Sequence, residues 1–165
     1  MGDRIVVMKD GVIQQFDTPK VLYDAPCNLF VAGFIGSPQM NFLDVKIAEE
    51  GGKMIAILGN DKLEIPEAKK AALKPYVGKT VILGVRPENF LTFDQLNAGN
   101  GITAKVDFCE LLGAETNLYV FVGDQKVIVR MSSAVDSPKE DIIKIPVDMA
   151  KAHFFDKETE LAICH

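Results

Sequence analysis

Two glycine-containing stretches of this 165-residue chain resemble loops that hold phosphate groups. The Gly-Lys-Thr triplet at residues 78–80 matches the end of a phosphate-binding loop, but that loop needs a glycine five positions before Gly78, and residue 73 is leucine. The stretch GNGITA at residues 99–104 imitates a dinucleotide-binding fingerprint, yet a strand-like pattern follows where the fingerprint requires a helix N-terminus. We therefore expect the chain neither to bind ATP specifically nor to hydrolyse it.

Reactive side chains elsewhere form no catalytic pattern. His153 and His165 are the only histidines in the sequence, which leaves too few for a metal cluster and no support for a serine–histidine pair. We expect His153 to have a structural role. The paired acids at residues 49–50 and 140–141 adjoin turn-like sequence, where solvated charge explains them better than acid–base catalysis. The sequence thus predicts no catalytic, metal-binding or cofactor-binding residue in this chain.

Charge and composition exclude several broad classes of protein. Lys and Arg total 18 against 23 Asp and Glu, and a net charge of −5 argues against binding to the phosphate backbone of nucleic acids. Three cysteines without a C-x-x-C pair argue against a disulfide framework and favour a reducing cytoplasm. The longest apolar stretch, residues 29–36, is shorter than the roughly 20 residues that span a bilayer. Strand-like sequence follows Met1 and Gly2 immediately, and we therefore expect the chain to be a fragment of a longer protein.

A hairpin and two short helices are expected before residue 38. Two apolar runs flank the pair Asp10-Gly11, which is typical of a tight hairpin turn. Thr18, with a proline after it, and Asn28 are residue types that cap helix N-termini. The second of these helices has no polar side, so we expect it to need cover all round. Its apolar residues are the candidates for self-association: Phe30, Val31, Phe34 and Ile35.

The remainder of the sequence predicts a small β-barrel. Period-two alternation dominates after Phe42, interrupted by glycine-containing turns and by a helical patch at residues 66–74. Many short strands with closely spaced turns favour a barrel over a parallel α/β sheet. Gly113 lies between two alternating runs, where a glycine permits a bulge or sharp bend that curls such a barrel. We assign structural roles to Gly113 and, at the end of the second helix, to Gly36 and Pro38.

Four stretches resemble a known family. They are FIGSPQMNF at residues 34–42, LGVRPENF at 83–90, ELLGAETNLYV at 110–120 and AHFFDKETELAI at 152–163. Together with the whole segment that ends at the first of them, they resemble the C-terminal part of MalK-type ATP-binding subunits of sugar-importing ABC transporters. The most specific parts of this resemblance are FIGSPQMNF and the Arg-Pro-Glu triplet. One departure is Glu160, where the family often has glycine, and it concerns only the geometry of the last turn.

The resemblance implies a division into two parts. Residues 1–38 would be the C-terminal tail of the ABC ATPase domain, and residues 39–165 an OB-like, TOBE/MOP-like regulatory domain that is mainly β. ATP, Mg and the catalytic motifs would belong to the full-length parent. The implied partners are a second copy of the chain, the missing N-terminal ATPase domain, the permease subunits and a possible regulatory protein. The implied location is the inner face of a prokaryotic cell membrane, and the implied cargo is carbohydrate.

Arg86, Pro87 and Glu88 are the leading candidates for an interface or regulatory cluster. The proline pre-sets a turn, which would present the two flanking opposite charges to a partner. The competing interpretation is a salt bridge within the chain that brackets the turn.

Met40, Asn41 and Phe42 are the second set of interface candidates. An asparagine between two apolar anchors either caps the start of a strand locally, which is the simpler interpretation, or fixes the linker against a partner.

An alternative function is binding of a small ligand. OB-like domains of this superfamily resemble binders of small oxyanions, and OB folds elsewhere bind saccharide or nucleic acid. Nucleic acid would favour a basic face with exposed aromatics, but this chain is acidic and has no Trp. An oxyanion or a sugar therefore remains the alternative ligand.

Overall fold

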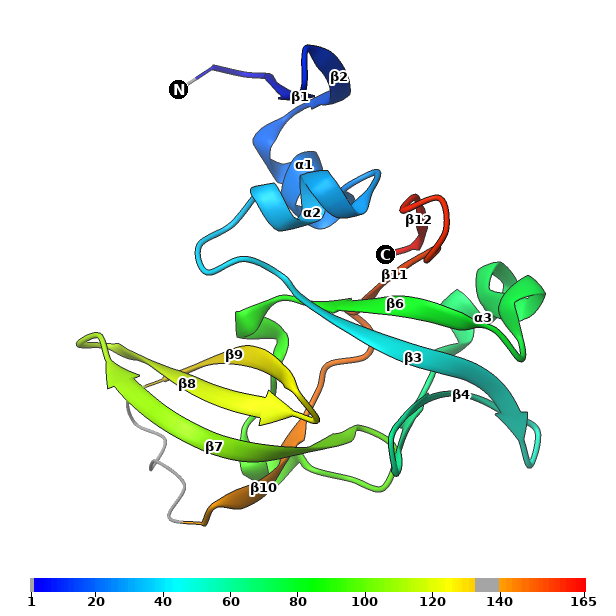
Figure 1. Ribbon diagram of the computed structural model, residues 1–165, viewed down its shortest axis with the longest axis vertical. Helices are drawn as coiled ribbons and strands as arrows, with labels where there is room; N and C mark the ends of the chain where they lie inside the picture. Colours follow the sequence, from blue (N-terminus) through cyan, green and yellow to red (C-terminus); the bar gives the residue numbers. More distant parts are fainter. Residues whose placement is uncertain (1, 133–139) are drawn as a thin grey trace.

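Three antiparallel sheets and three short α-helices make up the computed structural model, which describes residues 2–132 and 140–165 (Figure 1). The sheets have the strand orders β1-β2, β10-β7-β8-β9 and β12-β11-β6-β3-β4-β5. The strands are β1 Ile5–Lys9, β2 Val12–Asp17, β3 Asn41–Glu50, β4 Lys53–Leu58, β5 Asp61–Glu64, β6 Thr80–Val85, β7 Gly101–Leu111, β8 Glu115–Val122, β9 Gln125–Ser132, β10 Ile142–Pro146, β11 His153–Phe155 and β12 Ala162–Cys164. The helices are α1 Pro19–Asp24, α2 Leu29–Phe34 and α3 Glu67–Leu73, with 3-10 turns η1 Lys74–Tyr76, η2 Pro87–Asn89 and η3 Phe93–Gln95. Among the described residues, no helix has both the length and the apolar character to cross a membrane.

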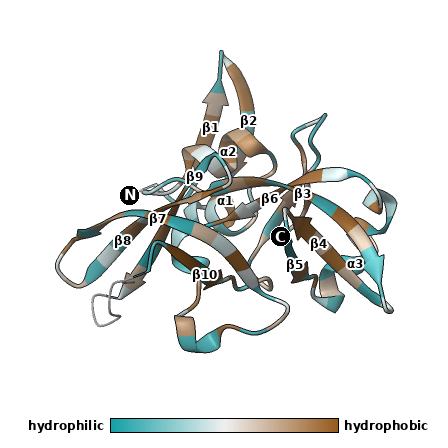
Figure 2. Ribbon diagram, turned by 60° about the horizontal axis from the view of Figure 1, so that its bottom comes forward, coloured by the Kyte–Doolittle hydropathy of each residue, from teal (hydrophilic) through white to brown (hydrophobic). Residues whose placement is uncertain are grey.

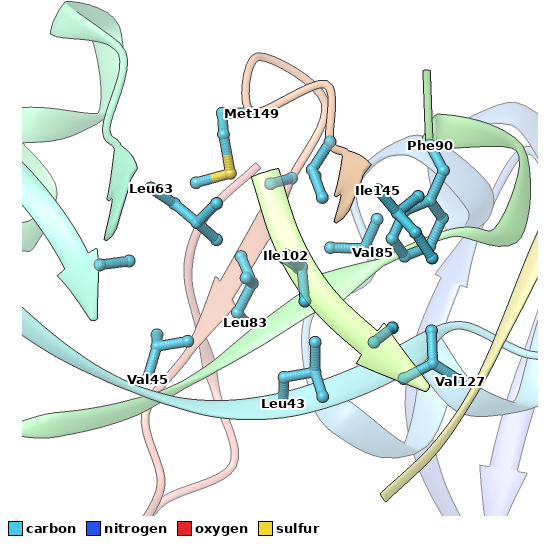
Figure 3. Close-up of a cluster of buried hydrophobic side chains, with 14 of the residues drawn as sticks. Leu43, Val45, Leu63, Leu83, Val85, Phe90, Ile102, Val127, Ile145 and Met149 are labelled. Atoms are coloured by element: carbon cyan, nitrogen blue, oxygen red, sulfur yellow. The ribbon is translucent and has the colours of Figure 1, made fainter. Parts of the chain in front are cut away.

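The two larger sheets enclose the main core. On β3 the alternate residues Leu43, Val45 and Ile47 are buried, as period-two alternation predicts. Figure 3 shows side chains of β3 and β6 facing those of β7, β9 and β10. Full burial of each such aliphatic side chain is worth about 1.5–3 kcal/mol, so the meeting of these two sheets stabilises the barrel. The prediction of a mainly β barrel is confirmed.

The predicted turn and caps of the N-terminal segment are confirmed. Asp10 and Gly11 have φ of 50° and 80°, the left-handed pair that a two-residue hairpin turn requires. Thr18 caps α1 by accepting from the amide of Val21, and Asn28 caps α2 through its side-chain oxygen at 2.9 Å from the amide nitrogen of Val31. This segment lies on one side of the barrel (Figure 1).

The side chains of α2 are buried to different extents, which corrects the prediction that this helix is covered on all sides. Val31 is buried and packs with Val7 of the hairpin, and Phe30 and Ile35 are partly buried in the same cluster. Phe34, in contrast, is 63% exposed. Because α1 and α2 cover one face of the hairpin, it is the opposite face that stays open.

The open face of the hairpin is apolar. Strand pairing sets Val6 opposite Phe16 and Met8 opposite Ile13, so these four side chains share one face of β1–β2. All four are exposed, Phe16 by 53% and Ile13 by 60%. The hairpin projects away from the rest of the chain, and apolar colour runs along it in Figure 2.

Gly113 was predicted to permit a bulge or a sharp bend, and the structure shows the bend: it lies in the connection between β7 and β8 with φ of 80°. The bulge is between Val106 and Phe108 instead. The alternation in β7 therefore breaks at this point: Ile102 and Ala104 are buried, but Phe108 is 47% exposed and stacks on Tyr119.

Glu160 adopts the conformation that a glycine would take easily. Its φ is 62°, in the left-handed region, so the chain keeps the turn although the residue differs from the family pattern. The carbonyl of Glu160 accepts from the amide of Leu29 at 3.0 Å, and the carbonyl of Cys27 accepts from the amide of Ala162 at 2.9 Å. These bonds join the start of α2 to the turn before β12.

Candidate functional site

We call the contact surface between the barrel and the two helices α1 and α2 the seam. Arg86 connects the two sides of the seam. Its Nη1 donates to the carbonyl of Ile35 at 2.8 Å, and its Nη2 donates to the carbonyl of Tyr23 at 2.6 Å. Tyr23 is in the last turn of α1 and Ile35 is the C-cap of α2, so both carbonyls belong to helix ends that lack intrahelical partners. A cation at the C-terminus of a helix also interacts favourably with the helix dipole. One guanidinium thus caps both helices from the barrel.

Burial isolates the charge of Arg86. The residue is 1% exposed, and its guanidinium carbon lies 3.7 Å from the centre of the Tyr23 ring. Desolvation lowers the pKa of Arg86 to about 10, with the nearby Asp24 acting in the opposite direction, so the side chain remains charged at neutral pH. Its Nε has no hydrogen-bond partner in the described part of the chain.

Pro87 and Glu88 complete the predicted triplet. Pro87 is buried and starts η2 directly after Arg86. The carboxylate of Glu88 accepts from the hydroxyl of Tyr23. No ion pair joins Arg86 to Glu88 within residues 2–132 and 140–165, so the competing prediction of a salt bridge that brackets the turn is wrong. Both charged side chains reach Tyr23 of α1 instead.

Gly36 allows the barrel to approach the end of α2. Its φ is 117°, and a Cβ at this position would lie 3.0 Å from Nη1 of Arg86. A side chain would therefore be strained and would crowd the guanidinium. Pro38 follows through a cis peptide bond with Ser37.

Met40, Asn41 and Phe42 contact both the barrel and the helices. The Asn41 side chain bonds to Ile128 of β9, accepting from its amide and donating to its carbonyl, each at 2.8 Å. It also donates to the carbonyl of Val85. The prediction of purely local capping is therefore wrong, since Asn41 links β3 to the other sheet. Met40 and Phe42 pack in the apolar cluster that also contains residues of α2 and β11.

A cavity of about 620 Å³ opens at the seam. Its lining includes Lys20 and Asp24 of α1 together with Arg86, Glu88 and two histidines. His153 is 5% exposed, and its Nδ1 lies 3.0 Å from Nδ1 of His165.

Burial favours the uncharged form of both imidazoles. Burial, followed by His165, Arg86 and Lys69, lowers the pKa of His153 to about 3. Burial and Lys69 also lower the pKa of His165. One ring donates to the other, which agrees with the structural role expected for His153. Within the two described ranges, no group of three His, Cys, Asp or Glu side chains is arranged to hold a metal ion.

Sequence reasoning did not identify Tyr23 or the carbonyl of Ile35 as parts of this site. A backbone carbonyl is available at every residue, so no residue type marks it as a partner. Arg86 and Gly36 were each named as candidates from the sequence, but only the structure shows that they lie together.

Comparison with known families assigns two domains. Residues 36–90 match the MalK OB fold domain, and residues 83–155 match the TOBE domain. The two matches overlap at residues 83–90, which contain Arg86.

Curated relatives align with almost the whole chain. It is 45% identical over 166 residues to an uncharacterized ABC transporter ATP-binding protein, YcjV, of Escherichia coli O6:H1, and 43% identical over 168 residues to the oligosaccharides import ATP-binding protein MsmX of Bacillus subtilis. It is 37% identical to the osmoprotective compounds uptake ATP-binding protein GgtA of Synechocystis. Each alignment covers 99% of this chain but only 44% or 45% of the relative, so the chain spans less than half of their length.

Among solved structures, the cytoplasmic molybdate-binding protein ModG has a similar fold. The TM-score is 0.52 at 16% identity, and the match covers 69% of this chain and 94% of ModG. At that identity the similarity concerns the fold alone, and it confirms the expected OB/TOBE-like class.

Proposed function

Because the chain belongs to the ABC transporter ATP-binding proteins and carries their MalK OB fold and TOBE domains, we propose that it is the regulatory and dimerisation region of an importer's ATP-binding subunit. Residues 1–38 would end the ATPase domain and residues 39–165 would form the regulatory domain. The parent protein would hydrolyse ATP with Mg and work with permease subunits at the inner face of the membrane. A second copy and a regulatory protein are its further proposed partners.

The seam is the observation that carries this proposal. Arg86 belongs to the barrel, yet among the described residues the hydrogen bonds of its side chain go to the ends of α1 and α2. Movement of the helices would therefore be transmitted to the barrel through a buried, charged contact. A region that couples an ATPase domain to its regulator needs such a fixed connection.

The open face of the hairpin supports the same division. Val6, Met8, Ile13 and Phe16 are exposed together, and an apolar face of this kind is typical of a surface that another domain covers. In the parent protein the remaining ATPase domain would pack there.

Carbohydrate is the proposed cargo of the parent transporter. MsmX is named for oligosaccharide import and GgtA for uptake of osmoprotective compounds. The higher identity to MsmX, 43% against 37%, favours the saccharide class.

A chimaera tests the function directly. The matching C-terminal part of MsmX would be replaced by this chain, and growth of an MsmX-deficient Bacillus subtilis strain on an oligosaccharide would be measured. We expect growth to be restored, and we expect Arg86→Met in the chimaera to reduce it. A chimaera that accumulates and hydrolyses ATP but supports no growth would contradict the proposed role.

A further inference from the structure

The side chains of His153 and His165 meet beside the strands β11 and β12. His153 is the first residue of β11, and His165 directly follows β12. Their Nδ1 atoms are 3.0 Å apart and their ring centres 5.2 Å apart. We call these two side chains the histidine pair. Because the sequence contains no other histidine, this contact involves every imidazole of the chain.

The segment that ends in the histidine pair is also bonded to α2. β12 has three residues and lies at the edge of its sheet, next to β11. The carbonyl of Glu160 accepts from the amide of Leu29, and the amide of Ala162 donates to the carbonyl of Cys27. A change that displaces β12 from β11 would therefore weaken the attachment of the start of α2, which belongs to the helix side of the seam.

The surroundings of the histidine pair oppose a positive charge. His153 is 5% exposed, and burial is the largest cause that lowers its pKa, followed by the charges of His165, Arg86 and Lys69. Asp24 acts in the opposite direction, but it is paired with Lys20. The titratable and charged groups around the pair are Lys20, Tyr23 and Asp24 of α1, Lys69 of α3, Arg86, Glu88, Lys151, Cys164 of β12 and the terminal carboxylate of His165.

Protonation of the histidine pair has two steps with different effects. In the neutral pair, one Nδ1–H donates to the Nδ1 of the other ring. A first proton fits on the Nε2 of the donor ring and keeps this bond, but it adds a charge to a buried site. A second proton requires the Nδ1 that accepts the bond, so it replaces the bond by two facing N–H groups. Both steps favour separation of the rings.

We propose that the histidine pair makes the attachment of β12 and of the start of α2 sensitive to pH, so that acidification loosens the seam. The inference rests on the proposed function, in which α2 belongs to the ATPase domain and the barrel is its regulator. In an acidified cell interior, the parent protein would then couple these two parts less firmly.

The direction of the effect follows from the pKa of His153 in the closed and the open pair. A histidine that opens to water has the ordinary pKa of 6.5, whereas His153 in the closed pair has a pKa of about 3. The open form therefore binds protons first. The closed pair contributes its full stability only above about pH 6.5 and loses it as the pH falls toward 3. At about pH 5.5, one unit below the free value, an opening that exposes His153 is favoured about tenfold.

Amide hydrogen exchange at two pH values tests the proposal on this chain. The reporters are the amides of Leu29 and Ala162, which donate the bonds between α2 and the segment of β12. Exchange rates would be divided by those of an unstructured peptide at the same pH, so that only opening is compared. Between about pH 7.5 and about pH 5.5, we expect these two amides to lose protection about tenfold, while the amides of β8 keep theirs.

Removal of both imidazoles is the control. The double change His153→Asn and His165→Asn leaves no histidine in the chain, so protection of the same amides should change less than about twofold over this pH range. The ratio between the two pH values is compared, because the absolute protection of the variant also reports lost packing. His165→Asn alone should give an intermediate ratio.

Four results would overturn the proposal. They are a ratio near one in the unaltered chain, the same loss in β8 as at the reporters, the unaltered ratio in the double variant, and an NMR titration in which His153 of the folded chain protonates near its ordinary pKa. The NMR titration needs no variant, so it decides even if the double variant does not fold. The chimaera is grown at a single pH, and failure of the pH proposal is therefore distinguishable from failure of the proposed function.

Discussion

Replacement of Arg86 by methionine should loosen the seam while leaving the barrel folded. Methionine keeps an unbranched side chain of similar length but donates no hydrogen bond. The change removes two bonds from a charged donor, to Tyr23 and Ile35, each worth about 1.5–3 kcal/mol. It also removes the contact with the Tyr23 ring, worth up to about 2 kcal/mol in a desolvated site.

Part of this loss of stability is offset, because the variant avoids the desolvation cost of burying a charge. That desolvation cost is several kcal/mol for a buried ion, and it is the same cost that lowers the pKa of Arg86. The balance of these opposing contributions leaves a net loss of about 3 kcal/mol. The loss should fall on the helices, since both lost acceptors are their terminal carbonyls.

Amide hydrogen exchange measures the effect residue by residue. If α1 and α2 open as a unit, a loss of about 3 kcal/mol should accelerate exchange of their amides by about 150-fold. The amides of Leu22, Ala32 and Ile35 are suitable reporters because each donates within its helix. Amides of β8 and β9 should keep their rates.

Arg130→Met is the matched control. Arg130 donates to the carbonyl of Ser37 at 2.8 Å, forms an ion pair with the exposed Glu115 and is less buried than Arg86, so its loss should accelerate helix exchange by about tenfold or less. Helix rates within about threefold of the original in Arg86→Met would refute the reasoning. Equal acceleration in the barrel would refute it as well, because Arg86 would then stabilise the whole chain.

Three further predictions follow from single features. Gly113→Val should cost about 1–3 kcal/mol and lower the melting temperature, since φ of 80° disfavours a β-branched residue although no atom would crowd its Cβ. Asn41→Ala should lower the free energy of unfolding in urea by about 3 kcal/mol, because it leaves the amide and carbonyl of Ile128 without this partner. The chain should self-associate at high micromolar concentration, and the double change Ile13→Ser and Phe16→Ser should weaken this in light scattering, because it removes apolar area from the open face.

Each of these has a control. Gly113→Asn should cost less than Gly113→Val, since asparagine tolerates the left-handed region, and equal melting temperatures would contradict the turn assignment. Asn60→Ala, in an exposed turn, should leave unfolding unchanged, and an equal loss would show that Asn41 has no special role. If both the original chain and the double variant were monomeric, or equally dimeric, the open face of the hairpin would not be the site of association.

Local features were predictable because their causes are local. The turn at Asp10-Gly11 and the caps at Thr18 and Asn28 each depend on residues within a few positions of one another. The barrel was predictable from alternation, since a strand with one buried face shows its period directly in the sequence. The family resemblance was also predictable from the sequence, because the short stretches that carry it are distributed along the chain, and the alignment with a relative covers 99% of it.

The bulge between Val106 and Phe108 marks where local reasoning failed. The alternation continues through both residues, so the sequence predicts one continuous face, but the bulge turns Phe108 outward onto Tyr119. Whether a strand bulges depends on how its partner strand and the opposite sheet fit, and no pattern within β7 records that.

What the sequence by itself determined is the hairpin turn, the caps of α1 and α2, the alternating strands and two candidate residues, Arg86 and Asn41. Only the tertiary structure decided what those two residues bond to. The acceptors of Arg86 are backbone carbonyls 51 and 63 positions away, and Asn41 bonds across 87 positions to Ile128. Partners so distant along the chain meet only when the sheets and helices pack, because packing brings together backbone groups that every sequence has in common.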